Sequence, residues 1–184
     1  MTNLLRCLTL LLLLTGAAMA QPEREARLAR LKADILASPS ATQLLTARCG
    51  ELKLAAPPVV RAEALPVAQG ADAEVRALLK VDAAEPVRHR HVQLTCGGHV
   101  LSDADNWYVP SRLTPAMNST LDGSDTPFGT VVRPLNFHRN TVAAIAQTGA
   151  TVLQVKAVLL TPQDSPISLV IENYSSDLLA DPKP

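Results

Sequence analysis

The sequence has few aromatic residues and no excess of charge of one sign. Aromatic side chains make up 3% of its 184 residues, so the core must consist mostly of Leu, Val, Ala and Ile. Lysine plus arginine and aspartate plus glutamate each number 17. This balance leaves no electrostatic footprint for nucleic acid and argues against adhesion to an anionic membrane surface.

The sequence also lacks several motifs that would announce a reaction. It contains no glycine-rich phosphate loop, no Cys-x-x-Cys pair and no nucleophile elbow. His89 and His91 lie on one face of a predicted strand, where both could ligate a metal. A zinc site needs three or four ligands, and no other His or Cys cluster completes one. We therefore expect two exposed strand residues and no metal.

The first 20 residues have the three parts of a secretory signal peptide. Arg6 precedes a Leu-rich run, and Ala18-Met19-Ala20 matches the A-x-A cleavage pattern. The alternative is an N-terminal membrane anchor, but the apolar stretch from Cys7 to Leu14 is shorter than the ~20 residues that span a bilayer. We expect cleavage of residues 1–20, export to the periplasm or the medium, and no membrane attachment of the mature chain.

Export affects the interpretation of the cysteines. Cys7 would leave with the signal peptide, and Cys49 and Cys96 would remain as an even pair in an oxidising compartment. A disulfide between them would close a long loop and stabilise the fold by about a few kcal/mol. The alternative is two separate buried thiols, which are common in protein cores. We favour the disulfide.

Hydrophobic periodicity predicts helices at the front of the chain and strands behind them. Apolar residues at helical spacing predict a helix over residues 23–37, and Ser40 with Gln43 forms a capping box for a second helix. Strand-like segments follow at residues 51–60, 87–96, 99–109, 131–132, 151–160 and 167–174. This order predicts a single α+β domain over residues 21–184, with one mostly antiparallel sheet.

Two charged residues lie where the pattern predicts apolar surroundings. Arg90 shares a strand face with Val92 and Leu94, so its guanidinium needs an anion, and a planar carboxylate fits it. The alternative is a strand-end arginine whose stem packs while its head reaches water. Glu172 follows an apolar run in the last strand, where a buried carboxylate needs a partner or an altered pKa. Its alternative role is a structural ion pair.

Several short segments carry a resemblance by their order and spacing. They are Ser40-Ala41-Thr42-Gln43-Leu44-Leu45, Arg90-His91-Val92-Gln93-Leu94, Trp107-Tyr108-Val109-Pro110, Thr126-Pro127-Phe128-Gly129 and Ile171-Glu172. Together they resemble the chorismate lyase family, whose members release pyruvate from chorismate to give 4-hydroxybenzoate. The similarity covers about residues 25–180. It implies an antiparallel sheet of about six strands with flanking helices that enclose a ligand cavity.

The resemblance also implies a site and a reaction. Arg90 would bind the ring carboxylate, Glu172 would give a proton or a hydrogen bond to the leaving oxygen, and the backbone N–H of Phe128 would donate a further hydrogen bond. An alignment without gaps would put His91 in the place of Arg90, but strand alternation favours Arg90. The implied elimination of pyruvate needs no cofactor.

A second function stays open at this point. Asp105-Asn106 stand where the family usually carries Gly and Arg. The alternative to an exported lyase is therefore a periplasmic binding or carrier protein for small aromatic carboxylates. In either case we expect a monomer without a nucleic-acid partner. We expect Arg90 and Glu172 to face one enclosed, mostly apolar cavity, several ångströms apart and closed by the loop at Phe128.

Overall fold

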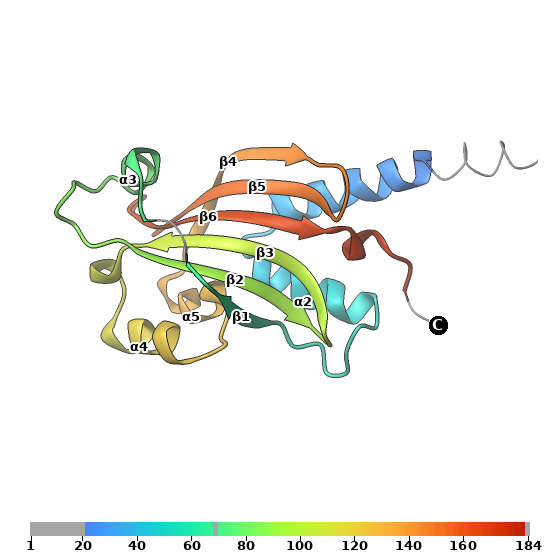
Figure 1. Ribbon diagram of the computed structural model, residues 1–184, viewed down its shortest axis with the longest axis horizontal. Helices are drawn as coiled ribbons and strands as arrows, with labels where there is room; N and C mark the ends of the chain where they lie inside the picture. Colours follow the sequence, from blue (N-terminus) through green and yellow to red (C-terminus); the bar gives the residue numbers. More distant parts are fainter. Residues whose placement is uncertain (1–20, 68–69, 183–184) are drawn as a thin grey trace, which may run out of the picture.

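The computed structural model describes residues 21–67 and 70–182, and six strands form its framework. They make one antiparallel sheet in the order β1-β2-β3-β6-β5-β4 (Figure 1). The bounds are β1 Arg61–Leu65, β2 Arg88–Cys96, β3 His99–Tyr108, β4 His138–Ala146, β5 Thr151–Leu160 and β6 Pro166–Ser175. The sheet and its flanking helices confirm the predicted α+β class.

The helices connect the strands and begin where the sequence offers caps. Residues 21–37 are helical, and the other helices are α2 Ala41–Glu51, α3 Ala73–Leu79, α4 Pro115–Gly123 and α5 Phe128–Val131. Short 3-10 turns lie at Pro110–Arg112, Arg133–Leu135 and Ser176–Leu179. The side chain of Ser40 accepts a hydrogen bond from the backbone N–H of Gln43, which confirms the predicted N-cap of α2.

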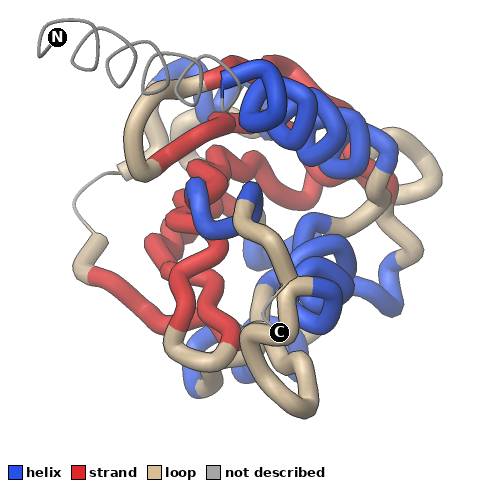
Figure 2. The backbone as a smooth tube through the Cα atoms, turned by 90° about the vertical axis from the view of Figure 1, so that its right-hand side faces the viewer, coloured by secondary structure: helices blue, strands red, loops and turns tan. Residues whose placement is uncertain are grey.

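One face of the sheet carries most of the helical cover (Figure 2). The helix over residues 21–37 and α2 pack on β2, β3, β5 and β6 in a cluster that includes Leu31, Leu45 and Val92. Residues of α4 and α5 join Tyr108 and other residues of the sheet in an adjoining cluster. On the opposite face α3 packs over Trp107 and its neighbours. The sheet therefore has one face that the helix over residues 21–37, α2, α4 and α5 cover and an opposite face that α3 covers in part.

A disulfide joins α2, which covers one face of the sheet, to strand β2. Cys49, near the end of α2, is bonded to Cys96 at the end of β2, with their Cα atoms 6.3 Å apart. Both cysteines are buried, with relative exposures of 0% and 1%. Next to the bond, Gly97 has a φ of +58°, and a Cβ there would lie 2.3 Å from the carbonyl oxygen of Leu54. Only glycine suits this turn, so the hairpin closes tightly against the loop after α2.

Three strand predictions were wrong in their details. Glu51 ends α2 and residues 52–53 form a turn, where the backbone N–H of Leu52 donates to the carbonyl of Arg48, and the strand begins only at Arg61. Val131 and Val132 donate their N–H groups to Pro127 and Phe128, so local helical hydrogen bonds prevail over their β preference. Strand β4 was not predicted, because three of its nine residues are alanine, which is depleted in strands.

The N-terminal segment that we expect to be cleaved, residues 1–20, lies outside the described residues. Among the helices that are described, none combines the length and the hydrophobicity that a membrane crossing requires. Processing after Ala20 thus stays a prediction.

Candidate ligand-binding site

The strand register brings the predicted polar residues to the roofed face of the sheet. Arg90 on β2 lies opposite Asn106 on β3, and Glu172 on β6 lies opposite Ala104 on β3. Directly paired residues share a face, and so do residues two apart on one strand. Arg90 and Glu172 therefore point to the same side, with two strand spacings and one strand repeat between them. That geometry separates their Cα atoms by about 12 Å.

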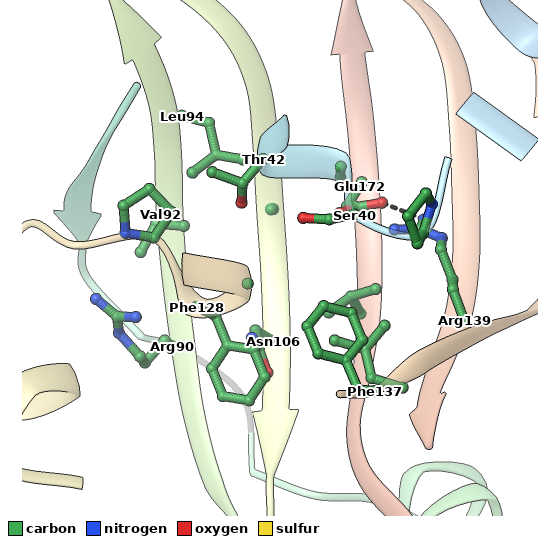
Figure 3. A pocket seen from close by; sticks show the side chains of 17 residues that line it. Ser40, Thr42, Arg90, Val92, Leu94, Asn106, Phe128, Phe137, Arg139 and Glu172 are labelled. Carbon is green, nitrogen blue, oxygen red and sulfur yellow. Dashed lines mark hydrogen bonds and ion pairs between the residues drawn. The ribbon is translucent and has the colours of Figure 1, made fainter. Parts of the chain in front are cut away.

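A pocket occupies the space between this sheet face and the helices that cover it. Its empty volume is about 540 Å³, part of which opens to solvent. Figure 3 shows Arg90 at one side, Glu172 with Arg139 at the other, and Phe128 and Phe137 between them. The full lining is Pro39, Ser40, Ala41, Thr42, Arg90, Val92, Leu94, Ala104, Asn106, Pro127, Phe128, Gly129, Phe137, Arg139, Leu159, Val170 and Glu172. Most of these side chains are apolar.

The starts of α2 and α5 meet over the pocket. Ser40 and Thr42 at the start of α2 face Gly129 of α5, where an added Cβ would lie 3.1 Å from Oγ1 of Thr42 and 3.2 Å from Oγ of Ser40. A Cβ at Gly129 would thus be tightly packed against both hydroxyl groups, and glycine eases this close approach. Phe128 lines the pocket, and no acceptor for its backbone N–H is recorded within residues 21–67 and 70–182.

Arg90 is half-buried and its charge is not neutralised. Within the described part of the chain its guanidinium has no hydrogen bond and no ion pair. Burial lowers the pKa of Arg90, although the charges of Tyr108 and Asp122 act in the opposite direction. Asp122 is already bound by Arg88, whose Nη1 lies 2.6 Å from Oδ2 of Asp122. A partly desolvated guanidinium without a partner is a binding group for an anion.

Glu172 belongs to a buried network. It forms an ion pair with Arg139, and the two side chains are 7% and 5% exposed. The hydroxyl of Tyr174 donates to Oε2 of Glu172 over 2.8 Å. Burial is the largest single influence on the pKa of Arg139 and lowers it, but the charge and hydrogen bond of Glu172 together with the interactions of Tyr174 outweigh burial, and the pKa is raised. Burial and the charge of Glu172 together raise the pKa of Tyr174 well above its usual range.

This network assigns Glu172 a structural partner, and that partner is not Arg90. Oε2 of Glu172 accepts from both Arg139 and Tyr174, so this oxygen acts as an acceptor rather than as the proton donor that the resemblance implied. Sequence reasoning missed Arg139, because β4 was not recognised as a strand. Arg139 reaches Glu172 across β5, and nothing in the local sequence indicates that contact.

Asn106 supplies the remaining polar group on the floor of the pocket. It is 5% exposed, and its Oδ1 accepts a hydrogen bond from Oγ of Ser168. No acceptor for its Nδ2 is recorded in the described segments of the chain. Since the oxygen is occupied, the two N–H donors of Asn106 are left for a bound molecule.

His91 lies on the opposite face of the sheet and outside the pocket. Its Nε2 is 2.9 Å from Oδ1 of Asp103, and this hydrogen bond is the main cause of a raised His91 pKa. His89, on the same face, pairs with Asp105 at 2.7 Å and stacks on Trp107. Its side chain is 7% exposed because these contacts cover it, so the expectation of an exposed residue was wrong for His89. The described residues contain no group of three side chains that could hold a metal ion. The alternation of β2 thus places Arg90, and not His91, in the pocket.

Comparisons with known proteins show a family to which the chain belongs and solved structures that share its fold. No protein-family model matches the chain. The uncharacterized protein y4mC of Sinorhizobium fredii is 34% identical over 194 residues, which cover 92% of this chain and 82% of that protein. The chain belongs to the same family as y4mC. This family relationship extends over 92% of the chain.

Solved structures share the fold at much lower sequence identity. The effector domain of PhnF from Mycobacterium smegmatis is 16% identical, with a TM-score of 0.51 over 64% of this chain and 82% of that one. The ligand-binding domain of a protein assigned to the GntR-family transcriptional regulators, from Bordetella bronchiseptica, is 20% identical, with a TM-score of 0.50 over 64% of this chain and 85% of that one. The expected chorismate lyase-like fold is confirmed at this level.

The same comparison overturns the expected function. We expected an exported chorismate lyase or a periplasmic carrier, but these neighbours are described as ligand-binding and effector domains of transcriptional regulators. They lend no support to a lyase, a periplasmic protein or a secreted protein. The physical reason for the error is that a fold fixes the place of a pocket and not its chemistry. Here Oε2 of Glu172 accepts hydrogen bonds from Arg139 and Tyr174.

Proposed function

We propose that this protein is an effector-type domain that binds a small aromatic carboxylate in the pocket beneath α2 and α5. The observation that carries the proposal is Arg90, a half-buried guanidinium without a partner in the described residues, at one side of a mostly apolar pocket. A carboxylate matches the planar fork of arginine and can accept two parallel hydrogen bonds. Binding would neutralise the charge that burial leaves unfavourable.

The walls of the pocket support an aromatic body for this ligand. Val92 and Val170 line the floor, and Phe128 and Phe137 stand over it. A flat ring fits between a sheet surface and aromatic side chains, where offset or tilted ring contacts are favourable. The neighbours described as ligand-binding and effector domains favour the same kind of role.

The binding test uses titration calorimetry with benzoate and 4-hydroxybenzoate. We expect Arg90→Ala to lose roughly 1.5–3 kcal/mol of binding free energy, which is about 10- to 150-fold in affinity. Arg61→Ala is the matched control, because Arg61 is an exposed arginine outside the pocket lining that pairs with exposed Asp125. It should bind like the wild type. Absence of binding to the wild type, or equal binding by a folded Arg90→Ala variant, would refute the proposal.

Two further expectations belong to this proposal. The balanced charge of the chain supports a domain that does not itself contact nucleic acid, and gel-shift assays at low salt test this expectation. The expected monomer is tested by sedimentation of the purified protein. A shift with DNA fragments of random sequence would contradict the first, and a stable dimer at micromolar concentration the second.

A further inference from the structure

The charged residues that line the pocket can be balanced by one negative charge on a ligand. Arg90, Arg139 and Glu172 are the charged side chains among the lining residues of the described chain. Arg139 and Glu172 neutralise each other in their buried ion pair. The net charge of the lining is therefore +1, and it resides on Arg90 at one side of the pocket. A ligand with a single carboxylate makes the occupied pocket neutral.

A second anionic group would find no cation with an uncompensated charge, because Arg139 is paired with Glu172 and, within the described residues, only its buried Nε lacks a hydrogen-bond partner. Beyond Arg90 the floor continues with Asn106, the direct cross-strand neighbour of Arg90, and Asn106 carries donors but no charge. Further along the floor lies the carboxylate of Glu172. Its Oε2 is occupied, and no partner for its Oε1 is recorded in the described residues. An anion there would lose its hydration and meet a like charge, and both effects are unfavourable in a buried site.

A neutral polar group meets favourable partners at the same place. The Nδ2 of Asn106 can donate a hydrogen bond, and Oε1 of Glu172 can accept one. A hydroxyl group can do both at once, since it carries one donor and two acceptor sites. The far side of the pocket is thus matched to a neutral group that both donates and accepts, whereas a second carboxylate would only accept.

We propose, on the basis of the function above, that the pocket selects monoanions. The ligand would carry one carboxylate on Arg90 and a neutral hydrogen-bonding group toward Asn106 and Glu172, and dianions of the same size would be rejected. Asn106 and Glu172 are then the residues that determine specificity. Asn106 is a neutral side chain that cannot pair with a second anionic group, and Glu172 neutralises Arg139 and repels a second anion. Arg90 provides affinity for both kinds of ligand.

The test compares three ligands on one ring, at a pH of about 7.5 and low salt. They are 4-hydroxybenzoate, a monoanion; terephthalate, a dianion; and monomethyl terephthalate, a monoanion larger than terephthalate. We expect the wild-type protein to bind both monoanions at least ten-fold more tightly than the dianion. If monomethyl terephthalate is rejected as strongly as terephthalate, size rather than charge is selected and the inference is wrong. If terephthalate binds as well as 4-hydroxybenzoate, the inference fails while the proposed function stands.

Two variants change the charge of the lining. Glu172→Gln removes the carboxylate and frees the charge of Arg139, and Asn106→Arg adds a cation without touching that buried pair. Each should raise the affinity for terephthalate relative to 4-hydroxybenzoate by at least ten-fold. Asp103→Asn is the matched control, because it removes one negative charge on the opposite face of β3 and should leave the ratio unchanged. An unchanged ratio in a folded Asn106→Arg protein would overturn the inference even if Glu172→Gln does not fold.

If no aromatic acid binds the wild-type protein, the proposed function fails, and the inference about charge falls with it. The two failures are therefore distinguishable by the first titration alone.

Discussion

Removal of the Cys49–Cys96 disulfide should destabilise the protein by about 4 kcal/mol. The two cysteines are 47 residues apart in sequence. On the chain-entropy account, a cross-link that closes a loop of this length lowers the entropy of the unfolded chain by an amount worth about 4 kcal/mol at 25 °C. For a chain of this size such a loss lowers the melting temperature by roughly 8–16 °C. The bond joins α2, which roofs the pocket, to β2, which carries Arg90.

The assay is urea unfolding of the Cys49→Ala/Cys96→Ala variant beside the oxidised wild type. Alanine is the suitable replacement, because both sites are buried and serine would bury a hydroxyl group. Wild-type protein reduced in denaturant and refolded in reductant separates the loss of the cross-link from the loss of sulfur packing. Two thiols that alkylate in the native, unreduced protein would refute the bond itself. A loss below about 1 kcal/mol would refute the entropic reasoning.

Three further predictions concern the buried pair, the opposite face and the N-terminus. Arg139→Met should lower the free energy of unfolding by about 3–5 kcal/mol in urea, because it leaves Glu172 buried without its cation. The Asp103 hydrogen bond raises the pKa of His91 above its unfolded value of about 6.5, so this stabilisation is complete below that pH and is lost as the pH rises through the folded pKa. Asp103→Asn should flatten that part of a pH series of unfolding curves. N-terminal sequencing of protein expressed from the full gene should give Gln21 as the first residue, and an intact start would contradict processing.

The floor of the pocket could be predicted because strand alternation is a local property. The alternation over residues 87–96 places Arg90 with Val92 and Leu94, and the structure puts all three in the pocket lining. The Gly97-Gly98 turn joins β2 and β3 into a hairpin, and both glycines have a positive φ. These features need only the period of a strand and the conformational freedom of glycine.

The partner of Glu172 could not be predicted in the same way. Arg139 lies 33 residues before Glu172 and on a strand that is not its neighbour in the sheet, so the contact depends on the complete strand order. Strand β4 lies at the edge of the sheet, and its alanines weaken the signal that would have revealed it. A pattern can show that a buried carboxylate needs a cation, but it does not identify which of the arginines reaches it.

That contact also bears on the role that the resemblance implied for Glu172. A glutamate in an apolar strand is compatible with a proton donor whose pKa is raised by burial and with the acceptor of a fixed ion pair. The local sequence around Glu172 is therefore compatible with either role. With Arg139 and Tyr174 on its Oε2, Glu172 balances charge at one side of the pocket, while Arg90 at the other side remains unbalanced. The arrangement favours holding an anion over transferring a proton, and it makes the charge of the ligand the property by which the pocket is best tested.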